Sequence, residues 1–204
     1  VRKRDGLRAF IGQIGGDGSG FSALFDAFGF ATGETPTAIA AGLWPLPGFP
    51  PAYLETLALA CRRLGAARTQ DSLVTDAQAA FTEPDPLRRL GLLTKAFLGG
   101  KGEPYKPGWL FGKALLAQMP DLPERYLEAA EAIMATGDRV ALLSMLEGTR
   151  AALTVADWLI ARYEQVKRGR GFLDFNDLIT RTVGLLARAD AGPWVQYKLD
   201  QGID

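Results

Sequence analysis

Histidine is absent from this 204-residue chain, and cysteine occurs once, at Cys61. Without an imidazole, the chain cannot assemble a Ser-His-Asp or Cys-His triad, and it offers no histidine ligand to a metal ion. A single cysteine cannot form an internal disulfide, and no Cys-x-x-Cys pair is present to hold zinc. These absences exclude much hydrolase and metal-centre chemistry, and they are typical of a protein of the reducing cytoplasm.

Long apolar runs and a net charge are also missing. No stretch approaches the roughly 18 to 20 apolar residues that span a bilayer, and residues 1–5 have no apolar segment behind them to make a signal peptide. Lys and Arg number 23, as do Asp and Glu. The balance lacks the surplus of a strongly basic nucleic-acid-binding domain, so a DNA site must be a local patch. We expect a cytoplasmic protein without membrane contact.

The apolar residues that are present follow a helical pattern. They make up 48% of the chain with aromatics and cysteine included, which is enough for a globular core. Apolar spacings of three and four recur from Leu54 to Leu186, whereas alternation at period two is nearly absent, so we expect an all-α fold. The expected helices cover residues 20–28, 35–41, 51–64, 126–134 with an end at Gly137, and 138–167, the longest.

The expected long helix carries one apolar stripe, because its apolar positions step by four and three residues. The stripe comprises Leu142, Leu146, Leu153, Ala156, Ile160 and Tyr163, with Thr149 among them. We expect this face to be buried.

Two Gly-Lys pairs resemble a phosphate-binding loop without matching its pattern, which needs a Gly five positions earlier and a Ser or Thr afterwards. Gly100-Lys101 is followed by Gly102, and Gly112-Lys113 is followed by Ala. The glycine-rich residues 15–20 contain no lysine. We therefore interpret all three as turns.

Positive charge gathers in residues 84–119, where six cations face two carboxylates. Within it, residues 98–108 have the prolines and glycines of an exposed loop. Lysines interleaved with aromatics suit phosphate contact with stacking beside it, although aromatics are more often core and lysines more often simply solvated. The candidate DNA-binding residues here are Lys95, Lys101, Lys106 and Lys113, with Tyr105 and Trp109.

A second basic cluster comprises Lys167, Arg168 and Arg170, at the expected end of the long helix. These cations are further candidates for DNA contact. They are explained equally well by the helix dipole, which favours positive charge at a helix C-terminus.

A helix start follows this cluster. Asp174 is placed as an N-cap and Asp177 as its capping-box partner, so both are interpreted as structural, and Leu173 is placed to pack on Leu178. The helix that follows is expected to bury one face, formed by Phe175, Leu178, Ile179, Thr182 and Leu185.

The C-terminal part also carries a specific resemblance. Residues 163–179 read YEQVKRGRGFLDFNDLI and residues 191–204 read AGPWVQYKLDQGID. This sequence resembles the segment just before motif II in the AddA-type, UvrD-like superfamily 1 helicase-nucleases of double-strand-break repair, with Asn176 in place of the usual Asp. Residues 96–106, AFLGGKGEPYK, look like a second, less specific segment of that family. Residues 1–80 match only in helical character.

The resemblance implies an internal piece of a longer enzyme. The ATP-binding loop would precede Val1 and the magnesium-binding Asp-Glu pair would follow Asp204, so the piece itself would have no catalytic residue, metal or cofactor. Residues 1–170 would form a 1B-like accessory region that contacts duplex DNA ahead of the motor, and residues 171–204 would return to the first motor domain. The parent would use ATP and magnesium, carry a nuclease and pair with an AddB-type subunit.

Two other interpretations stay open. The aromatic and leucine-rich faces would also suit a helical module that binds a partner protein. A free-standing hydrolase is disfavoured, because no nucleophile-base pair can be assembled without histidine or a second cysteine.

Overall fold

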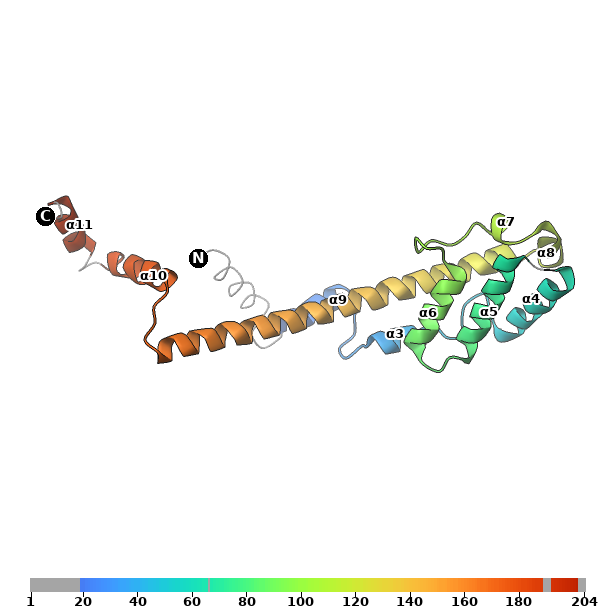
Figure 1. Ribbon diagram of the computed structural model, residues 1–204, viewed down its shortest axis with the longest axis horizontal. Helices are drawn as coiled ribbons and strands as arrows, with labels where there is room; N and C mark the ends of the chain where they lie inside the picture. Colours follow the sequence, from blue (N-terminus) through green and yellow to red (C-terminus); the bar gives the residue numbers. More distant parts are fainter. Residues whose placement is uncertain (1–18, 66, 189–191, 202–204) are drawn as a thin grey trace. The chain divides into compact units, whose positions relative to one another are not determined.

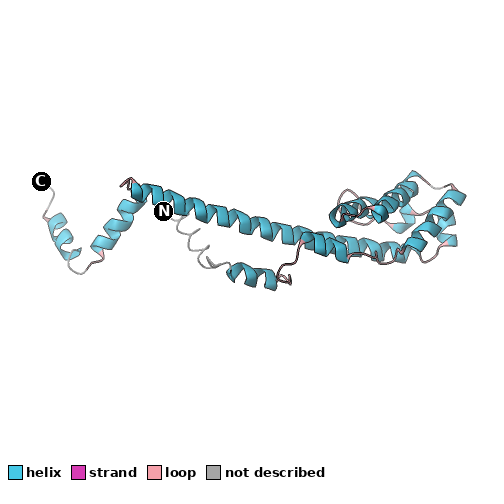
Figure 2. Ribbon diagram, turned by 90° about the horizontal axis from the view of Figure 1, so that it is seen from below, coloured by secondary structure: helices cyan, strands magenta, loops and turns pink. Residues whose placement is uncertain are grey.

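A computed structural model describes residues 19–65, 67–188 and 192–201 (Figure 1). Over these residues the secondary structure is helical, without a strand, so the expected all-α fold is confirmed (Figure 2). The helices are α2 Ser19–Ala27, α3 Pro36–Gly42, α4 Pro51–Leu64, α5 Arg68–Thr82, α6 Pro86–Phe97, α7 Pro107–Leu110, α8 Lys113–Gln118, α9 Leu122–Gly169, α10 Phe175–Leu186 and α11 Gly192–Asp200. In the described part of the chain, every helix is too short or too polar to cross a bilayer.

Local sequence signals place the starts of several helices. Proline stands at the first position of α3, α4, α6 and α7. At this position a backbone N–H would have no partner within the helix, so proline costs no hydrogen bond there. Thr35 accepts the backbone N–H of Ala38, and Asp85 accepts two N–H groups at the start of α6. The helices expected at residues 20–28, 35–41 and 51–64 are accordingly found at those places, the first two displaced by one residue.

The expected break at Gly137 is wrong, because α9 runs without interruption for 48 residues. A glycine inside a helix costs only about 1 kcal/mol relative to alanine, which buried neighbours can offset, whereas a glycine that follows a helix end often takes a left-handed conformation. Gly137 has no positive φ, whereas Gly171, just after the end of α9, has φ +67°. Buried side chains on both sides of Gly137, among them Ile133 and Leu143, keep the helix continuous.

The chain divides inside α9 into two compact units, and the first of them is Ala23–Gly148. Its main core is formed by α3, α4, α5, α6, α8 and the beginning of α9. At its centre lie Phe49, Phe97, Phe111 and Tyr126. Phe97 stacks on Tyr126 with 5.6 Å between ring centroids, and Phe111 meets the same ring edge-on at 5.4 Å. Such pairs add about 0.5 to 1.5 kcal/mol each to the gain from burial. A smaller cluster packs Phe30 and Ile39 against Leu143 and Leu146.

The second unit contains Thr149–Asp204. Its expected buried face on α10 is exposed instead: Phe175 is 76% exposed, and Leu178, Ile179, Thr182 and Leu185 are exposed as well. Leu173 and Leu178 are likewise exposed rather than closed into a hydrophobic staple. The periodic pattern identifies the apolar face of a helix but not what covers it, and the described residues place no element over this one.

The stripe expected on the long helix is buried only in part. Leu146 belongs to the core, Leu153, Ala156 and Ile160 are half-buried, and Tyr163 is exposed. The domain boundary expected after residue 170 rests on the resemblance and stays a prediction.

Candidate nucleic-acid interface

The loop after α6 is a tight, closed turn. Leu98 and Pro104 form an isolated antiparallel bridge. Inside it, the Gly99 N–H donates to the carbonyl of Glu103 and the Gly102 N–H donates to that of Gly99, both at 2.8 Å. Gly102 has φ +77°, a conformation that favours glycine. The turn presents Lys101 to solvent, and the expected exposed loop at residues 98–108 is present, with its last residues forming the start of α7.

Tyr126 fastens this loop to the core. Its side chain is fully buried on α9, its hydroxyl donates to the carbonyl of Phe97 at 2.6 Å, and it accepts the backbone N–H of Tyr105 at 3.0 Å. Burial raises the pKa of Tyr126 to about 12, so the hydroxyl keeps its proton and its donor role at neutral pH. Both ends of the loop are therefore bonded to one side chain.

The loop carries an aromatic pair, Tyr105 and Trp109. Their ring centroids lie 5.7 Å apart with 31° between the planes. The ring of Tyr105 also lies over Gly99, where an added Cβ would stand 3.3 Å from Cε1 of the ring. Trp109 is 66% exposed. The Trp109 indole is thus exposed to solvent, with the ring of Tyr105 close to it and the backbone of Tyr105 bonded to Tyr126.

A buried amide holds the next segment. Gln70 of α5 donates to the carbonyl of Leu110 at 3.0 Å and is only 8% exposed. It fixes the end of α7, the short helix that carries Trp109. Neither Gln70 nor Tyr126 stands out in the sequence, because a glutamine and a tyrosine in helical segments give no local sign of their distant partners.

The four lysines predicted to contact DNA on and after α6 differ in whether a carboxylate pairs with them. Lys101, Lys106 and Lys113 are exposed, and no carboxylate among the described residues pairs with them. Lys95 is 68% exposed, but its ammonium lies 3.0 Å from Asp76 of α5. The first three are therefore the better candidates for phosphate contact; along the chain Lys101 precedes the aromatic pair and Lys106 lies between its two members.

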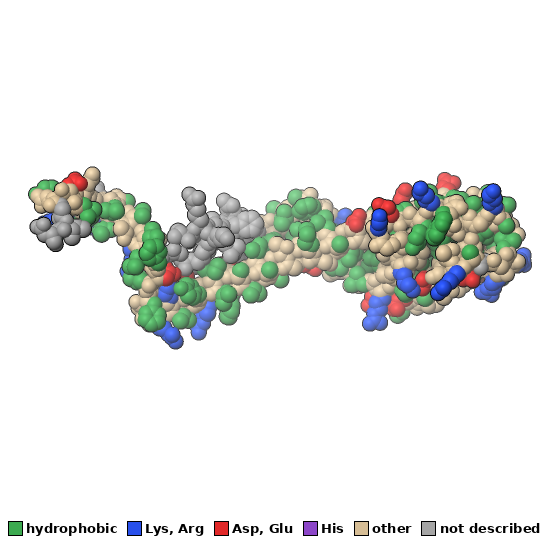
Figure 3. Space-filling model, turned by 45° about the horizontal axis from the view of Figure 1, so that its top comes forward, with side chains coloured by type: hydrophobic (Ala, Val, Ile, Leu, Met, Phe, Trp, Pro, Cys, Tyr) green, Lys and Arg blue, Asp and Glu red, His purple; other side chains and the backbone are tan. Residues whose placement is uncertain are grey.

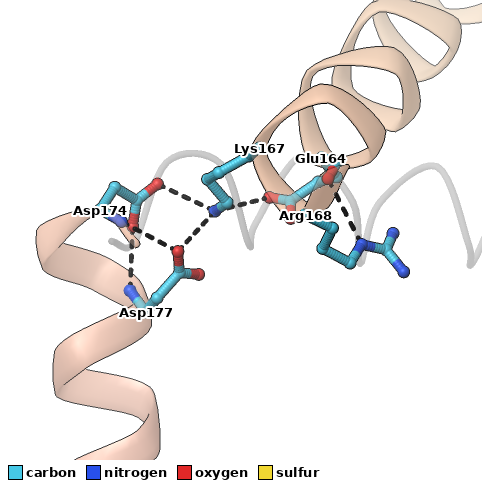
Figure 4. A network of polar contacts seen from close by, with 5 residues as sticks. All are labelled: Glu164, Lys167, Arg168, Asp174 and Asp177. Carbon is cyan, nitrogen blue, oxygen red and sulfur yellow. Dashed lines mark hydrogen bonds and ion pairs between the residues drawn. The ribbon is translucent and has the colours of Figure 1, made fainter. Parts of the chain in front are cut away.

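Lys167 lies in the other unit, in a polar network shown in Figure 4. Its ammonium lies 2.7 Å from Asp177, 3.1 Å from Asp174 and 3.4 Å from Glu164, and the side chain is 7% exposed. The hydrogen bond to Asp177, with those to Asp174 and Glu164, raises the pKa of Lys167, and the bond to Lys167 lowers the pKa of Asp177. This ammonium is occupied within the protein, so we leave Lys167 out of the DNA-binding proposal.

The two aspartates of this network also form the expected capping box at the start of α10. Asp174 accepts the backbone N–H of Asp177 at 2.9 Å, and Asp177 accepts that of Asp174 at 3.0 Å. This geometry gives Asp174 and Asp177 a structural role, which is to cap the start of α10. Arg168 and Arg170 are exposed and stay candidates, with Arg168 donating to the carbonyl of Glu164.

The exposed side chains of the two units differ in proportion. Lys and Arg side chains, with Asp and Glu among them, are distributed over the surface of the Ala23–Gly148 unit, and most of the exposed large apolar side chains lie along the helices of the other, together with several arginines (Figure 3). Among the described residues no group of acidic or cysteine side chains is arranged to hold a metal ion. No protein family model, curated protein or solved structure significantly matches the chain.

Proposed function

We propose that this chain is the DNA-binding, 1B-like accessory region of an AddA-type ATP-dependent helicase-nuclease that acts in double-strand-break repair. The family assignment rests on the resemblance of residues 163–179 and 191–204. The observation that carries DNA binding is the anchored loop, which presents the exposed indole of Trp109, paired with half-buried Tyr105, together with lysines that no described carboxylate neutralises. ATP, magnesium and the nuclease belong to the parent enzyme.

The proposed physical role of the three exposed lysines follows from their positive charge. Lysine ammonium groups contact backbone phosphates, and such contacts carry no sequence information. A motor that moves along DNA needs this kind of attachment, because its grip must not depend on the bases it passes. An AddB-type subunit would be the protein partner of the parent.

The test is a titration of the 204-residue chain with blunt duplex DNA across a salt series. If Lys101, Lys106 and Lys113 each neutralise one phosphate, the logarithm of affinity should fall against the logarithm of salt with a slope of about −2.7. That slope corresponds to about 40-fold weaker binding at 200 mM than at 50 mM salt. Absence of binding, or binding that salt does not weaken, would refute DNA contact by this region.

A second candidate function, a protein-binding module, is favoured by an exposed apolar stripe on the C-terminal part of α9. The stripe lies on one face, since its members are spaced by one, three or four residues. It comprises Val155, Trp158, Leu159, Tyr163 and Val166. A protein docked there would bury these side chains and leave the salt dependence of duplex binding unchanged.

A further inference from the structure

The exposed apolar stripe on the C-terminal part of α9 has two arginines among its members. Arg162 lies four residues after Trp158 and four before Val166, and Arg170 lies four residues after Val166. Both arginines are exposed, and within the described part of the chain no carboxylate forms an ion pair with either; Arg162 donates to the side chain of Gln165. Residues four apart share a helix face, so the stripe places positive charge among apolar side chains.

A pocket of about 350 Å³ opens at the end of this stripe. Tyr163 and Val166 belong both to the stripe and to the lining of the pocket, to which Phe172 adds a further apolar side chain. Lys167 and Asp174 also line it, and their ion pair of 3.1 Å fixes the turn between α9 and α10 (Figure 4). The pocket can accept a large apolar side chain, which is how a protein partner is commonly anchored.

The composition of this surface indicates a protein as the ligand. Aromatic residues and arginine are enriched in the core of protein interfaces, whereas lysine, glutamate and aspartate are depleted there. Contact with phosphates alone would not need the exposed Trp158 and Leu159 beside the guanidinium groups. Two copies of the chain packed stripe against stripe would bring like charges together, because the members of the stripe include no carboxylate. The arginines therefore select a partner of opposite charge.

We propose that this surface binds an acidic amphipathic helix of a partner protein. Apolar side chains of that helix pack on Trp158 and Leu159, one of them enters the pocket, and carboxylates beside them pair with Arg162 and Arg170. The inference rests on the second candidate function, protein binding at the stripe, and names the chemistry of the partner. It does not depend on DNA contact by the loop after α6.

The test uses the 204-residue chain and three synthetic peptides of about 18 residues, which as helices are long enough to cover the stripe. The first peptide has leucines on one helical face and glutamates beside them. The second has lysine in place of each glutamate, and the third has the composition of the first in scrambled order. Fluorescence anisotropy should show that the glutamate peptide binds about tenfold more tightly than either of the others.

Three variants of the chain locate the binding. Trp158→Ala should weaken binding of the glutamate peptide by about tenfold or more, as for an aromatic residue at the centre of an interface. Leu59→Ala, which truncates an exposed apolar side chain of the other unit, should leave the affinity unchanged. Arg162→Glu should reverse the preference, so that the lysine peptide binds more tightly than the glutamate peptide. A variant that had lost its fold would bind neither.

The outcomes separate this inference from the proposed DNA contact. Equal binding of the glutamate and lysine peptides would keep an apolar docking face but contradict an acidic partner. The inference is also wrong if the glutamate peptide does not bind or if duplex DNA displaces it. Sedimentation of the unchanged chain as a dimer that Trp158→Ala dissociates would assign the stripe to a second copy instead. The salt slope of duplex binding tests the DNA contact separately.

Discussion

Replacing Tyr126 by Phe should lower the free energy of unfolding by about 1 to 3 kcal/mol. The substitution removes the hydroxyl, and the buried carbonyl of Phe97 and the N–H of Tyr105 then lose their hydrogen-bond partner. The ring and its contacts with Phe97 and Phe111 are retained. The loss therefore measures the hydrogen bonds alone. Denaturant unfolding followed by circular dichroism gives the difference directly.

The matched control is Tyr53→Phe. The Tyr53 hydroxyl donates to Asp121 at 3.1 Å in an exposed setting, where water can replace the lost partner. We expect a change within about 0.5 kcal/mol, as for most surface substitutions. Equal effects at the two tyrosines would contradict the anchoring role assigned to Tyr126. Because the anchor also fixes the loop, Tyr126→Phe should weaken DNA binding, and Tyr53→Phe should not.

Replacing Lys101, Lys106 and Lys113 together by Ala should bring the salt slope of duplex binding from about −2.7 to near zero. At low salt the affinity should fall by at least tenfold, and the loss should be the same for DNA of any sequence, because phosphate contacts do not read bases. All three side chains are exposed, so stability should change little. Fluorescence anisotropy with labelled duplexes at several salt concentrations measures both quantities.

Two variants serve as controls for the lysines. Replacing the same three residues by Arg keeps the charge and should keep the slope. Lys95→Ala removes an ammonium that is already paired with Asp76, so it should change the slope less than the loss of Lys106 alone. An unchanged slope in the triple alanine variant would remove the loop from the DNA path and favour the protein-binding alternative.

The sequence predicted those features that depend on neighbouring residues. The side chain of Asp174 marks the start of α10, and the glycines and prolines of residues 98–108 mark the loop. Each signal acts over a few residues, through a fixed φ angle or a side chain that bonds a nearby N–H. Such signals therefore do not depend on which other segments of the chain pack against them.

Features that depend on distant partners were not predicted. The continuity of α9 through Gly137 depends on buried side chains on both sides of the glycine. The pairing of Lys95 with Asp76, and of Lys167 with Asp174 and Asp177, is decided by how helices meet. Charge counting along the sequence treats all lysines alike, and only the geometry separates the occupied ammonium groups from the free ones.

Backbone amide resonances of the isotope-labelled 204-residue chain, followed while duplex DNA is added, test the central claim most directly. The largest shifts should fall on residues 99–113, which contain the turn, the aromatic pair and the three free lysines. Added salt should reverse these shifts. Shifts confined to residues 155–199, or none at DNA concentrations that saturate the anisotropy signal, would contradict DNA binding at this loop.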